Sequence, residues 1–199
     1  MGRGRCRRPR PRGRPSSSGF TLLEVVFVAA VLCTLMAIAI PRLLTSVDRS
    51  RGRAAARYLA SRMALARAQA VSRSATVALR FQVEGRTVNF SIIQDGNRNG
   101  VRTRDIQLQI DRPIEAPVAL ADLFPGVDIG LAPQTPGTDA VQLGGTDILS
   151  FTPTGTSTSG TVYLRGRDGT QWAVRVLGAN ARSRVLRYIP DTREWVYAF

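Results

Sequence analysis

The feature that most constrains this chain is an apolar run from Phe20 to Ile40 that contains a single charged residue, Glu24. At about 1.5 Å per residue, a helix of this length spans roughly 32 Å, which matches the hydrocarbon core of a membrane. A carboxylate inside such a segment costs on the order of a few kcal/mol. The run therefore predicts a transmembrane helix over 20–40, with Glu24 either held by a specific partner or reaching the interface.

The residues before the run form a basic leader, because Met1–Ser18 contains seven arginines and no acid. Residues 19–24 read Gly-Phe-Thr-Leu-Leu-Glu, and this motif after a basic leader resembles the prepilin cleavage motif of type IV pilins and type II secretion pseudopilins. The resemblance implies that prepilin peptidase cuts between Gly19 and Phe20 and N-methylates Phe20. Residues 1–19 are then a processing segment rather than part of the fold.

In the fibres of that family, Glu24 would be the fifth residue of the mature chain. The resemblance implies that the N-terminal amine of a neighbouring subunit neutralises it, and a charge pair in a low dielectric needs such a partner.

A second processing route stays open, because Ala37-Ile38-Ala39 is similar to a signal-peptidase site. Cleavage there would release a domain that begins at Ile40. Pro41 beside that bond disfavours the route, and the first residue of the mature protein, Phe20 or Ile40, distinguishes the two.

Pro41 ends the apolar run, and a proline inside a helix removes one hydrogen-bond donor and produces a kink or a break. In pilins a proline at this distance from the cut kinks one long helix, so the resemblance implies that the helix continues. Residues 41–74 form an amphipathic stem whose apolar side recurs at three- and four-residue steps. The expected inner positions are Leu44, Val47, Arg51, Ala55, Tyr58, Leu59, Met63, Ala66 and Ala70.

From Ala75 onward the period changes to alternation, which predicts a β-rich head over 75–199 and an α+β fold overall. The strands are expected at 76–83, 86–93, 106–110, 126–131, 147–152, 161–165, 171–177, 182–189 and 194–198, mostly antiparallel. Asp111–Thr146 is expected to be mainly loop. After removal of the leader only Cys33 remains, so the mature chain forms no internal disulfide.

The basic charge lies on the stem. Arg42–Ser74 carries eight arginines and one acid, whereas Ala75–Phe199 carries 13 arginines and 12 acids. A basic segment beside a membrane span suits anionic lipid headgroups or acidic neighbours.

The stem and the two strands after it resemble the GspH/FimT branch of pilin-like proteins, as does Phe151-Thr-Pro-Thr-Gly155 with its following strands. The resemblance implies a minor pseudopilin of type II secretion or a minor type IV pilin. Its expected partners are other pilin or pseudopilin subunits, prepilin peptidase, the inner-membrane assembly platform and membrane lipid. The leader is expected in the cytoplasm and the head in the periplasm.

Residues 95–100 read Asp-Gly-Asn-Arg-Asn-Gly, the beginning of a calcium loop. The candidate ligands are Asp95, Asn97, Asn99 and Asp105, although the twelfth position holds Ile106 instead of glutamate. An Asn/Gly-rich turn between strands is the favoured interpretation, so no cofactor is expected.

A basic cluster near the C-terminus offers a possible nucleic-acid site, formed by Arg165, Arg182, Arg184 and Arg187. DNA-capturing FimT-like pilins carry a Gly-Arg-x-Arg element near this position, and here Ala181 replaces the glycine. A solvated strand face is the simpler interpretation. Trp172, Tyr188, Trp195 and Tyr197 could stack on bases, but packing is favoured.

Catalysis is not expected. The chain has no histidine, and no serine or cysteine stands in a recognisable nucleophilic arrangement.

Overall fold

The computed structural model describes residues 19, 21–84 and 87–198, and its first element is helix α1 (Leu22–Arg73). The helix continues through Pro41, as expected for a pilin-like stem, while the kink itself stays a prediction. It ends where Ser74 adopts a φ of 51°, and the backbone N–H of Ala75 donates to the carbonyl of Ala70. A residue in the left-handed region is a common way to terminate a helix.

The chain divides into two compact units, the first ending at Arg42 and the second beginning at Leu43. In the first unit, every described residue of α1 is exposed. This part of α1 is long and apolar enough to cross a membrane. Exposed side chains of this kind need lipid or another protein to cover them.

In the second unit, α1 buries one face against the head. The buried positions are Gly52, Ala55, Ala56, Leu59, Met63, Ala66 and Ala70. The expected face is therefore confirmed from Ala55 to Ala70. It is wrong at Leu44 and Val47, which are exposed and do not belong to the core cluster that α1 forms with the sheets.

Gly52 allows a close approach of α1 to the head. A Cβ atom at this position would lie 2.7 Å from Nε1 of Trp172, and the Trp172 ring is buried in the core. Glycine normally weakens a helix interior by about 1 kcal/mol relative to alanine. Here the absence of a side chain makes room for the indole.

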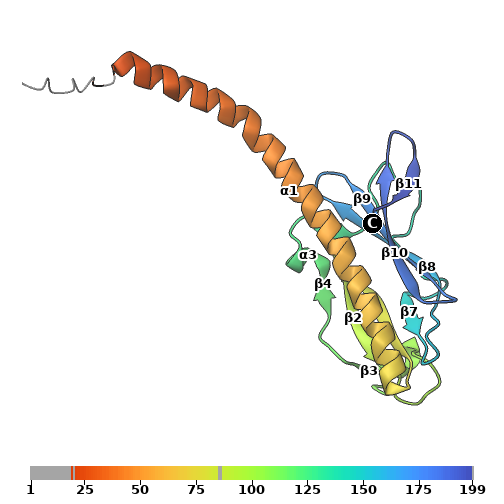
Figure 1. Ribbon diagram of the computed structural model, residues 1–199. Helices are drawn as coiled ribbons and strands as arrows, with labels where there is room; N and C mark the ends of the chain where they lie inside the picture. Colours follow the sequence, from red (N-terminus) through yellow and green to blue (C-terminus); the bar gives the residue numbers. More distant parts are fainter. Residues whose placement is uncertain (1–18, 20, 85–86, 199) are drawn as a thin grey trace, which may run out of the picture. The chain divides into compact units, whose positions relative to one another are not determined.

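The described strands form two antiparallel sheets, shown in Figure 1. The first contains β1 (Val77–Glu84), β2 (Thr87–Gln94), β3 (Arg112–Pro113), β4 (Val118–Ala119) and β7 (Ile148–Phe151). The second contains β5 (Val127–Ile129), β6 (Val141–Gln142), β8 (Gly160–Gly166), β9 (Gln171–Leu177), β10 (Arg182–Ile189) and β11 (Glu194–Tyr197). In the second sheet the order is β11-β10-β9-β8-β5, with β6 also pairing with β8.

One hydrophobic core joins α1 to both sheets. Leu59 and Met63 of α1 pack with Leu79 and Phe90 of the first sheet and with Val174 of the second. These side chains are almost completely buried. The second half of α1 therefore serves as part of the head's own core, and the α+β expectation is confirmed.

The expected strand at 106–110 is wrong. Helix α2 (Thr103–Gln107) occupies its start, and the chain then turns back, with Gln109 at a φ of 58°. The backbone N–H groups of Ile110 and Asp111 both donate to the carbonyl of Asp105. The alternating apolar residues misled the prediction, because Ile106 is buried whereas Leu108 is exposed.

The expected loop at 111–146 contains β3, β4, β6 and helix α3 (Leu120–Leu123), besides β5, where a strand is expected. Several polar contacts hold it to the rest of the head, including an ion pair and a buried hydrogen bond. Arg62 of α1 forms an ion pair with Glu115, and the backbone N–H of Ala132 donates to the buried side chain of Gln171.

Candidate functional site

The residues expected to act in assembly lie at the start of α1. Gly19 is described and exposed, Phe20 lies outside the described residues, and Glu24 stands in the first turn of the helix. Cleavage after Gly19 and methylation of Phe20 stay predictions. Glu24 is followed by exposed apolar side chains as far as Ile40, so its carboxylate stands at one end of an uncovered apolar helix.

Thr21 contributes a helix cap that sequence reasoning missed. Its Oγ1 accepts a hydrogen bond from the backbone N–H of Glu24 at 3.3 Å. Threonine followed three residues later by glutamate is the pattern of a capping box, so the signal was present in the sequence. The bond uses the backbone of Glu24, and the Glu24 side chain stands in the first turn, where a negative charge is favourable.

The four calcium candidates do come together, but their side chains form hydrogen bonds within the loop itself. Asp95 accepts hydrogen bonds from the backbone N–H groups of Asn97, Arg98 and Gly100, at 2.7–3.0 Å. The side-chain amides of Asn97 and Asn99 donate to the same oxygen of Asp105, at 3.4 and 3.1 Å.

Sequence reasoning missed Asp111, which completes this loop. Asp111 is fully buried and accepts from the N–H groups of Gly96 and Arg102, both at 3.0 Å. The geometry is that of a closed polar turn. Among the described residues, no group of three or more His, Cys, Asp or Glu side chains could hold a metal ion.

The four arginines of the C-terminal cluster do not share one surface. Arg182 and Arg184 line a groove beside α1. Arg187 lies on the opposite face of β10 from Arg184. It lines a different hollow, together with Arg49 of α1. Arg165 lies near Asp128, its cross-strand neighbour on β5. Nucleic-acid binding stays a prediction, and its basic site is smaller than the sequence suggested.

Arg184 stands directly opposite Arg175 in the antiparallel pair of β10 and β9. Like charges in this position destabilise a sheet, since the Cβ atoms of such a pair are about 5 Å apart. Arg175 has a 3.4 Å contact to the Thr161 hydroxyl, while Arg184 donates to the Tyr197 hydroxyl at 2.9 Å and lies over its ring. The ion pairs found in the described part of the chain involve other arginines, namely Arg49, Arg51 and Arg62.

Three of the four aromatic side chains pack as expected, and Tyr197 does not. Trp172 and Tyr188 are buried, and Trp195 contacts both Tyr163 and Tyr188. Tyr197 remains exposed, and Arg184 is its cation partner.

Two protein-family models match this chain. The family model described as type II transport protein GspH matches residues 55–181, more than half of the chain. The model of the prokaryotic N-terminal methylation motif matches residues 14–40. A comparison with curated protein sequences gives no significant match.

Among solved structures, the chain is similar to the minor pseudopilin EpsH from the type 2 secretion system of Vibrio cholerae. The two are 16% identical, the match covers 69% of this chain and 97% of that one, and the TM-score is 0.45. With the family model covering the second part of the stem and most of the head, the chain belongs to the GspH family of type II transport proteins.

Proposed function

We propose that this protein is a minor subunit of a type II secretion pseudopilus and that it assembles through the exposed apolar part of α1. The observation that carries the proposal is the contrast between the two parts of this helix. From Ala55 onward α1 supplies residues to the core of the head, whereas from Leu22 to Ile40 every residue is exposed. Before assembly lipid would cover the apolar side chains, and in a fibre the helices of neighbouring subunits would replace it.

Glu24 would be the specific contact of that assembly. Its carboxylate would pair with the amine that cleavage after Gly19 creates on Phe20 of a neighbouring subunit. A buried charge is tolerable when a partner of opposite charge and further hydrogen bonds accompany it. The protein would wait in the inner membrane with the head in the periplasm, processed by prepilin peptidase and recruited by the assembly platform.

The first residue of the natural mature protein tests the processing on which this proposal depends. Mass spectrometry of the protein isolated from membranes is expected to give an N-terminus at Phe20, increased in mass by one methyl group. Signal-peptidase cleavage would instead give Ile40, and a head released in this way would lack both Glu24 and the apolar helix. A chain that begins at Ile40 would overturn the proposal.

A further inference from the structure

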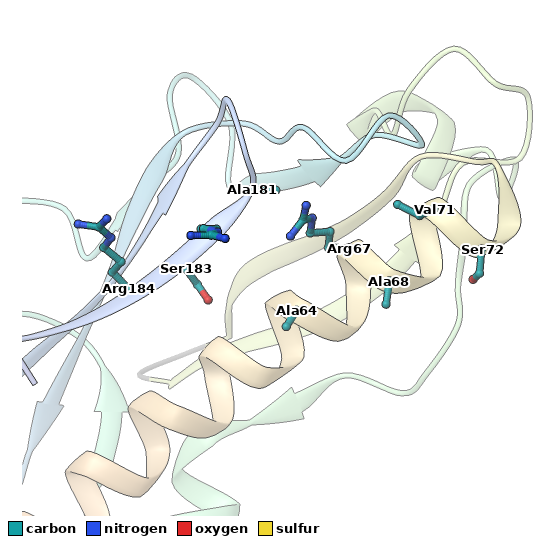
Figure 2. Close-up of a pocket in the computed structure, with 9 residues that line it drawn as sticks. Ala64, Arg67, Ala68, Val71, Ser72, Ala181, Ser183 and Arg184 are labelled. Carbon is teal, nitrogen blue, oxygen red and sulfur yellow. The ribbon is translucent and has the colours of Figure 1, made fainter. Parts of the chain in front are cut away.

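We propose that an extended peptide segment in which acidic and apolar residues alternate docks on the free edge of β10 beside α1. The site is the edge groove, a hollow of about 790 Å³ between the C-terminal half of α1 and the beginning of β10. Figure 2 shows its two sides, with Ala64 and Ala68 on the helix and Ser183 on the strand. The partner is a segment of another protein. The site is separate from the exposed apolar part of α1, through which we propose that the protein assembles.

The first half of β10 has an unpaired edge. Strand β11 pairs with β10 only from Leu186 to Ile189, and the N–H of Ala198 then donates to the carbonyl of Val185. Backbone groups along a strand alternate between its two edges. The N–H and C=O of Ser183 therefore face the same side as the Val185 carbonyl, where no strand among the described residues continues the ladder. Such an edge is a template for an added strand.

The helix side of the groove combines an apolar wall, formed by Ala64, Ala68 and Val71, with Arg67 and Ser72, and Figure 2 shows Arg67 reaching toward the strand. Ala64 and Ala68 are exposed toward it, and Val71 is half exposed at the C-terminal end. Ser183 points toward this side in Figure 2, as its strand parity requires. Every second side chain of a strand added beside Ser183 would therefore face α1, where it would meet the apolar wall and Arg67.

The remaining side chains of an added strand would face arginines. Arg182 and Arg184 lie on the opposite face of β10 from Ser183, and Figure 2 shows Arg184 directed away from α1. Arg175 adds a third charge across the ladder. Within the described structure none of these three arginines forms an ion pair, and none of the residues lining the groove is acidic. The like-charge pair of Arg175 and Arg184 would be relieved by carboxylates.

These features together favour a peptide over a nucleic acid. Phosphates would satisfy the arginines, but they would use neither the backbone groups of Ser183 nor the apolar wall of α1. An extended peptide would use all three, with main-chain hydrogen bonds supplying affinity and alternate side chains supplying specificity.

The test measures binding of a fluorescent eight-residue peptide of alternating aspartate and valine to the full chain in detergent, by anisotropy. Binding is expected for this peptide and not for one of alternating lysine and valine. Arg182→Gln combined with Arg184→Gln should weaken binding about 10-fold or more, because each arginine loses a charge-assisted contact. The matched control is Arg102→Gln combined with Arg104→Gln, which removes two exposed charges from outside the groove and should leave binding unchanged.

Ser183→Pro separates strand addition from simple charge attraction. It removes the N–H on the free edge and no bond of the β9–β10 ladder, and proline is tolerated on edge strands. We expect the variant to keep the thermal unfolding temperature of the parent and to lose peptide binding. If this variant does not fold, Ala68→Glu tests the same site by placing a negative charge on the apolar wall, and it should also weaken binding.

Two results would overturn the proposal. One is unchanged peptide affinity in the folded Ser183→Pro or Ala68→Glu variant. The other is displacement of the peptide by a single-stranded oligonucleotide that has the same affinity for Ser183→Pro as for the parent. That result would identify a phosphate-binding surface. Neither result bears on fibre assembly, which depends on the apolar part of α1.

Discussion

Replacing Glu24 by alanine is expected to abolish incorporation of the protein into fibres while leaving it inserted in the membrane. Insertion should not suffer, because the change removes a charge from an apolar segment. Incorporation should fail, because the amine of the neighbouring subunit would be buried without a counter-charge. Loss of one partner of a buried charge pair costs about 2–5 kcal/mol, roughly 30-fold or more in an equilibrium constant. The measurement is the ratio of the protein in sheared fibres to that in membranes.

The position of Glu24 in the first turn of α1 provides the control for this prediction. Glutamine is also accepted at the third position of a capping box, so Glu24→Gln suits the helix start while it removes the charge. If charge pairing decides assembly, Glu24→Gln should fail as Glu24→Ala does. Normal incorporation of Glu24→Gln would contradict the pairing, because it would show that assembly does not need the negative charge.

Replacing Leu59 by aspartate is expected to unfold the head. Leu59 is fully buried where α1 meets both sheets. The change removes the burial of a leucine, about 2–3 kcal/mol, and adds an unpaired carboxylate in an apolar core. The combined cost, more than about 5 kcal/mol, is comparable to the whole stability of a small domain.

Leu65→Asp is the matched control, because Leu65 lies on the same helix and is 38% exposed. Limited proteolysis of the protein in detergent should degrade the head of Leu59→Asp and leave that of Leu65→Asp intact. Equal resistance of the two variants would contradict the finding that this stretch of α1 is part of the head's core.

The sequence predicted the elements whose pattern is set by their own residues. The expected strands at 171–177 and 182–189 agree with β9 and β10 residue for residue, because short apolar runs are bounded there by turn residues. The buried face of α1 was found from Ala55 to Ala70 through its three- and four-residue steps.

What could not be predicted depends on residues far apart in the sequence. The 106–110 stretch alternates as a strand does, but the buried Asp111 binds the N–H groups of Gly96 and Arg102 and holds the chain in a closed loop. The edge groove likewise requires Ala64 of α1 to lie beside Arg182, more than a hundred residues later. The arginine cluster was divided by strand parity, which places Arg184 and Arg187 on opposite faces of β10.

The most direct test of the account is to identify what contacts the apolar part of α1 in the assembled fibre. A photo-crosslinking amino acid at Leu35, an exposed residue of this segment, would be activated in sheared fibres, with the same group at exposed Leu123 of the head as the control. The account predicts covalent adducts between Leu35 and the N-terminal helix of another pseudopilin subunit. Adducts of Leu35 with lipid alone, in fibres that contain the protein, would contradict it.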